Sequence, residues 1–215
     1  MSSTPELRVT TDLVGDTVAL FLETNPRTIA LSGGSTPKPV YERLAETPYP
    51  WEEVDAFFGD ERCVPADHPD SNFRMANESL LSKVPARAHP MVGCDPDAYT
   101  RELQQVFGPD LPRFDLLFMG IGDDGHTASL FPGKPALDVT DRWVVGVPEP
   151  GMPPEHPRMT LTFPVLNAAK LALFLAQGEK KRDALRKLVG GDESIPAARV
   201  KSDRVIVLAD PEAAG

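Results

Sequence analysis

Residues 120–132, GIGDDGHTASLFP, carry a histidine and an acidic pair directly after an apolar run at 114–119 that only Asp115 interrupts. Such a run is typical of a strand buried on both faces of a parallel sheet. Ligands of parallel sheets bind outside the carboxyl ends of the strands, where these polar residues would lie. Because an imidazole exchanges protons near neutral pH, His126 is a candidate general base, with Asp124 as the carboxylate that orients its ring.

Glycines separate the polar groups of this segment. Gly120, Gly122 and Gly125 permit turns and a close approach of a ligand to the backbone that a Cβ atom would obstruct. On the residues alone, an ordinary turn with an acidic tip and a capping histidine is an equally open interpretation.

A second glycine-rich stretch, SGGSTP at 32–37, follows the short apolar run 28–31 and precedes a helical pattern. Strand, glycine-rich turn and helix start together direct several backbone N–H groups at one point, which suits an anion. The stretch fits neither GxxxxGK[ST] nor GxGxxG, so no nucleotide site is indicated. A plain turn is the alternative. The candidate anion-binding residues are Gly33, Gly34, Ser35 and Thr36.

Charged residues also end the apolar run 54–58, where Asp60, Glu61 and Arg62 follow Gly59. The end of a parallel strand is where active-site groups usually lie, so Asp60 and Arg62 are candidates. For Glu61 a solvated loop is an open alternative.

The nearby residues Asp67, His68 and Asp70 resemble a metal-binding group in composition. Their spacing matches no established ligand motif, and exposed loops often contain such residues. We therefore predict no metal site here.

The composition is that of a protein with one sizeable core, and 215 residues predict a single domain, 1–215. A net charge of −10 argues against a nucleic-acid partner. The longest apolar run, 171–176, is too short for a bilayer, and the N-terminus shows no signal-peptide pattern. Cys63 and Cys94 are expected to be free thiols in a reducing cytoplasm.

The elements that position these groups alternate between helix and strand. We expect helices at 6–24, 37–45, 71–81, 97–107, 164–170 and 179–189, and strands at 28–31, 54–58, 88–92, 114–119, 143–147, 158–163, 171–176 and 204–208. Five prolines mark 148–157 as a loop over one edge. The alternation implies an α/β fold with a parallel, doubly wound sheet covered on both faces.

Several motifs, in this order, resemble those of the 6-phosphogluconolactonases, a family in the superfamily of the glucosamine-6-phosphate deaminases. They are SGGSTP at 32–37, GDERCVP at 59–65, SNFRMANESLL at 71–81, GIGDDGHTASLFP at 120–132, RMTLTFPVLNAAK at 158–170 and, more weakly, GEKKRDAL at 178–185. The resemblance implies a Rossmann-like three-layer sandwich with a mostly parallel sheet, similar to the sugar-phosphate deaminases.

The resemblance also implies an activity: hydrolysis of 6-phospho-D-glucono-1,5-lactone to 6-phosphogluconate in the oxidative pentose phosphate pathway, by general-base activation of water. It places Arg158 and Lys181 on the phosphate side, whereas Lys180 is expected to be a solvated surface charge. For Arg62 two roles stay open, binding of the phosphate and binding of the developing oxyanion. Asp60 matches a deaminase position linked to proton transfer, and here we expect it to organise substrate hydroxyls or water.

We expect no cofactor and no metal, a small-molecule substrate as the partner, no nucleic acid or membrane, and a monomer or small homo-oligomer. A deaminase is the first rival, but the residues after His126 (Thr127 to Pro132) lack the glutamate that the deaminases carry there. A sugar-phosphate sensor without catalysis is the second rival. Such sensors usually come attached to DNA-binding segments, and no such segment is visible. The C-terminal stretch also lacks a tryptophan that many relatives have.

Overall fold

A seven-stranded sheet, in which every pairing is parallel, forms the centre of the computed structural model, which describes residues 4–215. Residues 1–3, part of the terminus in which no signal peptide is expected, lie outside this range. In spatial order the strands are β1 (Glu6–Val9), β10 (Arg204–Ala209), β9 (Leu171–Ala176), β6 (Leu116–Gly120), β2 (Thr28–Leu31), β3 (Asp55–Phe58) and β5 (Arg87–Ala88).

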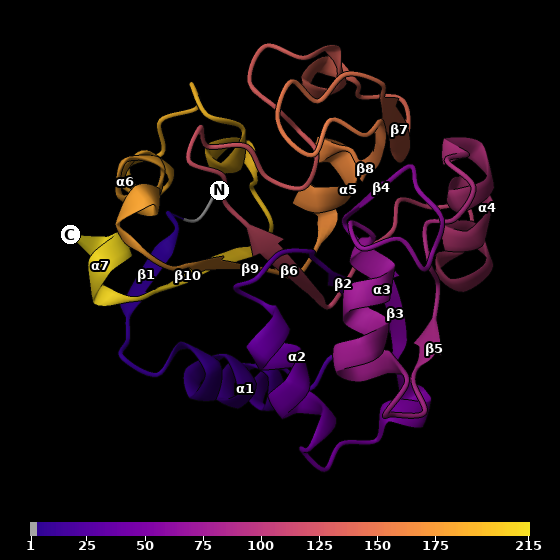
Figure 1. Cartoon of the computed structure of the whole chain (residues 1–215), viewed down its shortest axis with the longest axis horizontal. Coiled ribbons are helices and arrows are strands. Elements are labelled where there is room, and N and C mark those ends of the chain that lie inside the picture. The colour runs from indigo at the N-terminus through magenta and orange to yellow at the C-terminus, as the bar shows by residue number, and fades with distance from the viewer. Residues whose placement is uncertain (1–3) are drawn as a thin grey trace.

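Helices cover both faces of this sheet. In Figure 1 the strands cross the middle of the view, with α1 and α2 below them and α6 above. The helices are α1 (Leu13–Thr24), α2 (Lys38–Ala45), α3 (Asn72–Ala76), α4 (Pro96–Phe107), α5 (Phe163–Ala168), α6 (Arg182–Gly190) and α7 (Pro211–Ala214). The predicted α/β class with a mostly parallel sheet is confirmed. Within the described residues, no helix has the length and apolarity needed to cross a membrane.

The core lies between sheet and helices, because the central strands are apolar on both faces. All six residues of β9 are buried, as are Phe57 and Phe58 of β3. Phe118 of β6 stacks on Phe21 of α1 with ring centroids 6.4 Å apart. Two-sided burial explains why these strands appear in the sequence as continuous apolar runs rather than as alternating ones.

Asp115, the polar residue just before β6, ties that strand to β2. Its Oδ2 accepts hydrogen bonds from the backbone N–H groups of Arg27 and Thr28, at 2.8 and 2.9 Å, and its Oδ1 lies 2.7 Å from Nζ of Lys170. This carboxylate therefore aligns the starts of two neighbouring strands, and thereby their carboxyl ends.

A second, three-stranded antiparallel sheet was not predicted. It consists of β4 (Asp60–Arg62), β8 (Arg158–Leu161) and β7 (Val144–Val147), with Asp60 opposite Thr160. Residues 60–62, expected as a strand-end loop, are therefore a strand. A three-residue strand is too short to show a periodicity, and only its pairing with β8 makes it recognisable.

The predicted helix at 6–24 is wrong at its start, since residues 6–9 form the edge strand β1 and the helix begins at Leu13. Asp12 caps the helix, and its side chain accepts from the backbone N–H of Gly15. Residues 6–9 are extended because they pair with β10, a partner distant in sequence. The helix predicted at 71–81 is present, with a π-helical turn in its second half.

Candidate active site

A pocket of about 250 Å³ opens at the carboxyl ends of β2, β3, β6 and β9, which are neighbours in the sheet. The chain leaves β2 toward β3 on one side, whereas β6 is followed by β9 and β10 on the other. The pocket therefore lies at a topological switch point, where open parallel sheets bind their ligands.

The residues after β2 form one wall. Gly33 and Asn72 are in such close contact that a Cβ atom on Gly33 would overlap the side-chain amide of Asn72. Gly34 has a φ of 104°, a conformation that side chains rarely allow. The turn leads into α2, whose first backbone N–H groups have no side-chain cap. This wall can therefore offer backbone donors to an anion.

His126 and Asp124 form a pair at the end of β6. Nδ1 of His126 lies 2.6 Å from Oδ1 of Asp124, and the backbone N–H of His126 donates to the same oxygen. Burial acts to raise the pKa of Asp124, but the bonds from His126 outweigh it and hold this pKa below its usual value. Because Nδ1 is bonded to the carboxylate, Nε2 is the ring nitrogen that can exchange a proton with a ligand. A Cβ atom on Gly122 would collide with the imidazole.

Asp60 is buried, and each of its carboxylate oxygens accepts a hydrogen bond from one side chain. Its Oδ2 accepts from the hydroxyl of Ser129 at 2.6 Å, and its Oδ1 accepts from Nδ2 of Asn72 at 3.2 Å. The backbone N–H of Ser129 donates in turn to Oγ1 of Thr160 on β8. These bonds hold one carboxylate between the two sheets at the pocket wall.

Glu61 is not in a solvated loop, the alternative left open above, since it is only 3 % exposed. Its carboxylate accepts from the backbone N–H groups of Arg62, Asn72 and Phe73 and from the hydroxyl of Ser71. Burial raises the pKa of Glu61, and these bonds oppose that rise. The buried carboxylate joins the start of α3 to β4 and thereby positions Asn72 and Arg62.

Two arginines reach the pocket from the small sheet. Nη1 of Arg62 donates to the carbonyl of Asp70, and Nη2 of Arg158 donates to that of Pro154. The buried Nε atom of each has no hydrogen-bond partner among the described residues. Burial lowers the pKa of Arg158, a shift that Asp60 opposes and Arg62 reinforces. Since an arginine stays charged, two half-satisfied guanidinium groups beside one pocket favour an anionic ligand.

Lys181 approaches from the turn after β9. Its Nζ lies 2.7 Å from Oδ1 of Asp123, the residue before Asp124. The lysine is thus held at the pocket by the same loop that carries His126.

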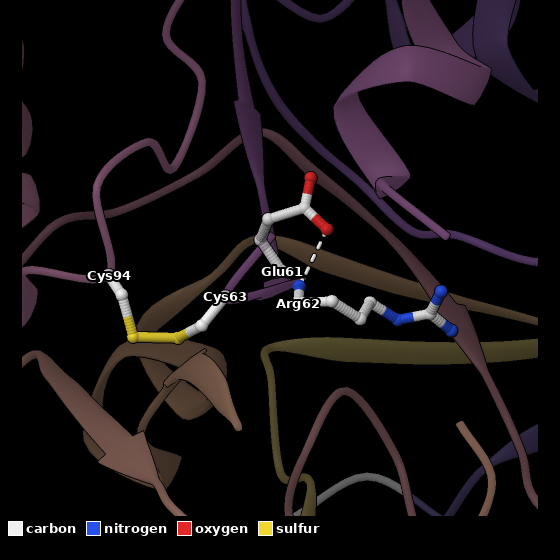
Figure 2. Close-up of a disulfide and its surroundings, with 4 residues drawn as sticks. All are labelled: Glu61, Arg62, Cys63 and Cys94. Atoms are coloured by element: carbon white, nitrogen blue, oxygen red, sulfur yellow. Dashed lines mark hydrogen bonds between the residues drawn. A yellow bond between two sulfur atoms is a disulfide. The ribbon is translucent and has the colours of Figure 1, made fainter. Parts of the chain in front are cut away.

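A disulfide joins Cys63 to Cys94 next to this site, so the expectation of free thiols is wrong. Cys63 directly follows Arg62, and Figure 2 shows the arginine side chain extending away from the disulfide. The Cα atoms are 5.0 Å apart although the residues are 31 positions apart in sequence. The turn before α4 brings Cys94 to the end of β4, which the spacing alone does not encode. The expectation of a reducing compartment rested on free thiols, and the disulfide removes that support.

The group of acidic and histidine side chains that meet after β4 has other members than the sequence group Asp67, His68 and Asp70. Asp67 is exposed and is not part of the group, which instead contains His68, Asp70 and His156, with potential ligand atoms within 4.8 Å of one another. His156 comes from the proline-rich segment 148–157, 86 residues after Asp70.

The structure brings the predicted site residues together. Apart from Asp124, which is bonded to His126, all of them line the pocket: Gly33, Gly34, Ser35, Thr36, Asp60, Arg62, His126, Arg158 and Lys181. Sequence reasoning missed Asn72, Ser129 and Ala128. Ala128 has a φ of 47°, a strained conformation typical of functional sites. All three lie within the motifs quoted above, which was the available signal.

The chain is similar to known proteins in sequence and in structure. The model of the family described as glucosamine-6-phosphate isomerases/6-phosphogluconolactonase matches residues 7–208. A 6-phosphogluconolactonase from Synechocystis sp. is 47% identical over 173 residues, which cover 75% of this chain and 70% of that protein.

Two solved structures are similar over nearly their whole length. The 6-phosphogluconolactonase from Trypanosoma cruzi is 32% identical, with a TM-score of 0.88 over 100% of this chain and 97% of that one. The enzyme of the same name from Thermotoga maritima is 30% identical, with a TM-score of 0.85 over 96% and 99% of the two chains.

Proposed function

Because the chain belongs to the glucosamine-6-phosphate isomerase/6-phosphogluconolactonase family, we propose that it hydrolyses 6-phospho-D-glucono-1,5-lactone to 6-phosphogluconate, a step of the oxidative pentose phosphate pathway. One observation carries the proposal: His126, which is bonded to Asp124, borders the same pocket as a group of three cations, Arg62, Arg158 and Lys181. A phosphorylated lactone needs a base at one end and an anion site at the other.

The reaction begins with water. Nε2 of His126 removes a proton from the water molecule as its oxygen attacks the C1 carbonyl of the lactone. The imidazolium is stabilised by Asp124, whose lowered pKa keeps it ionised at neutral pH. The tetrahedral intermediate then collapses, the bond between C1 and the ring oxygen breaks, and the imidazolium returns the proton to that oxygen.

The phosphate binds between the turn at 33–36 and the arginines. Backbone N–H groups of the turn and the free donors of Arg158 supply charge-assisted hydrogen bonds. Lys181 adds a mobile positive charge by exchanging Asp123 for a phosphate oxygen. Arg62 lies near enough to Arg158 to lower its pKa, so the two guanidinium groups form one anion site. We place Asp60, with both oxygens held by Ser129 and Asn72, on the sugar hydroxyls.

The residues after His126 favour hydrolysis over deamination. Thr127 and Ser129 are fully buried and bonded to Gly120 and Asp60, and no acid occupies 127–132. Asp60 is the acid among the described residues that line the pocket.

The scheme uses protein groups throughout, so we propose no cofactor. Cytoplasmic location, a single domain over 1–215 and a monomer or small homo-oligomer remain predictions.

An assay with freshly generated lactone, corrected for spontaneous hydrolysis, tests the proposal. We expect enzyme-dependent formation of 6-phosphogluconate and no release of ammonia from glucosamine 6-phosphate. A hydrolysis rate equal to the background, with folded protein, would refute it.

A further inference from the structure

Two histidines and an aspartate meet beside the pocket, outside the groups used above. Nε2 of His156 lies 2.9 Å from Oδ2 of Asp70, and Nδ1 of His68 lies 3.8 Å from the same oxygen. The imidazole rings are nearly perpendicular, with centroids 5.3 Å apart. Two ring nitrogens and one carboxylate oxygen therefore point toward a common space.

A cation would replace hydrogen bonds that this group now makes. The backbone N–H of Asp70 donates to Nδ1 of His68, so this nitrogen is unprotonated, and an ion would take the place of that N–H. Nε2 of His156 bonds to the carboxylate of Asp70 and would bind the ion in its unprotonated form. Arg62 contacts the carbonyl of Asp70, not its carboxylate, and so leaves both carboxylate oxygens to other partners. Each of the three side chains is about one third exposed, so an ion has access from solvent.

The spacing is close to that of a metal site. Ligand distances of about 2.0–2.1 Å in a tetrahedral zinc site place neighbouring ligand atoms roughly 3.3 Å apart. The two distances to Asp70 lie on either side of this value, and the three ligand atoms all lie within 4.8 Å of one another, so the side chains must move closer together to bind an ion. Two imidazoles and a carboxylate leave a fourth position for water.

The group connects two segments that are held by the pocket arginines. His68 and Asp70 belong to the turn after β4, whose Asp70 carbonyl binds Arg62. His156 belongs to the proline-rich segment 148–157, whose Pro154 carbonyl binds Arg158. An ion held by all three side chains would cross-link these segments.

We propose that His68, Asp70 and His156 bind a divalent transition-metal ion of the zinc class, which fastens the segment 148–157 over the arginine side of the pocket. The positive charges of Arg62 and Arg158 oppose binding, and the ionised carboxylate of Asp70 counters them. The ion is an accessory to the fold and takes no part in the proposed hydrolysis.

Zinc titration of chelator-treated full-length protein by calorimetry tests the site, with Co²⁺ absorption as a second probe. We expect one equivalent to bind, and His156→Ala, His156→Gln and Asp70→Asn each to weaken binding at least about tenfold. Asp67→Asn is the matched control, because it removes a neighbouring exposed carboxylate, and it should bind like wild type. His126→Ala, which removes the pocket imidazole, should also bind like wild type.

Stability provides an independent readout. Zinc at about one hundred times its Kd should raise the melting temperature of wild type by about 5–10 °C, and that of His156→Ala by much less. The proposal is overturned if wild type shows no saturable binding, if His156→Ala binds as wild type does, or if His126→Ala abolishes binding. None of these outcomes depends on whether the lactone is hydrolysed.

Discussion

Nζ of Lys181 lies 2.7 Å from Oδ1 of Asp123, so the loop that carries the proposed general base also neutralises a cation of the proposed phosphate site. A phosphate that binds Lys181 must displace this carboxylate or share the ammonium group with it. Arg158, in contrast, donates to the carbonyl of Pro154 and has a buried Nε atom without a hydrogen-bond partner among the described residues, so that Nε gives up no bond when it meets an anion. The two cations should therefore contribute unequally.

Arg158→Ala should raise KM for the phosphorylated lactone by about ten- to a hundredfold, because a charge-assisted hydrogen bond contributes about 1.5–3 kcal/mol. Lys181→Ala should have a smaller effect, and Arg158→Lys should recover only part, since an ammonium lacks the planar fork. The measurement compares the phosphorylated lactone with unphosphorylated gluconolactone. Lys180→Ala, at an exposed neighbouring position, is the control. Equal losses on both substrates would show that these cations do not bind the phosphate.

His126→Ala should lower kcat by roughly 10²- to 10⁴-fold, the usual contribution of a positioned general base. The side chain is partly exposed and packs against Phe131, so the variant should fold, which circular dichroism and a urea midpoint can verify. The rate must be corrected for spontaneous hydrolysis. Turnover near that of wild type in a folded variant would remove His126 from the mechanism.

Exhaustive chelation should leave the hydrolysis rate of wild type essentially unchanged. The proposed reaction uses protein groups alone, and the proposed metal group is not among them. The measurement is kcat before and after dialysis against a chelator. Loss of activity that one particular metal ion restores would contradict the mechanism.

Asp115 should make stability depend on pH in the acid range. Burial acts to raise the pKa of Asp115, but its bonds to Lys170 and to the backbone of Arg27 and Thr28 leave it below the ordinary 3.8. Its stabilisation is therefore complete above about pH 4–5. It is lost as the pH falls through the ordinary value toward the lower folded value, because the unfolded chain takes up the proton first. Asp115→Asn should flatten this part of a plot of melting temperature against pH.

The disulfide should stabilise the folded protein. Closing a loop over the 31 positions between Cys63 and Cys94 corresponds to about 3–4 kcal/mol of lost unfolded-chain entropy. Cys63→Ser with Cys94→Ser should lower the free energy of unfolding by up to this amount. Urea midpoints with and without a reductant check it, and the double variant should not respond to the reductant. A wild-type midpoint that is insensitive to reductant would contradict the prediction.

Elements whose burial shows within one segment of the sequence were predicted well. Residues 171–176 form β9 within the expected bounds, because a strand buried on both faces is apolar throughout. The convergence of the turn after Leu31, the loop at 120–126 and Lys181 was also predictable, since parallel strands share one carboxyl edge.

Features that arise from pairing between distant segments were not predictable. The residues of β1 have a pattern that predicts the start of a helix, because four mostly exposed residues show a strand only through their partner β10. Neither the 31 positions between the cysteines nor the 86 between Asp70 and His156 form a periodic signal. The contact of Asn72 with Gly33 likewise depends on how α3 packs.

The position of β10 between β1 and β9 has a consequence for biosynthesis. Glu6 pairs with Ile206, so β1 has no sheet partner until almost the whole described chain that follows it has been synthesised. During this interval its N–H and C=O groups form an unpaired edge, which is prone to association with other nascent chains. Two of the four residues of β1, the exposed Glu6 and the partly buried Arg8, are charged, and charged residues on an edge strand oppose such association.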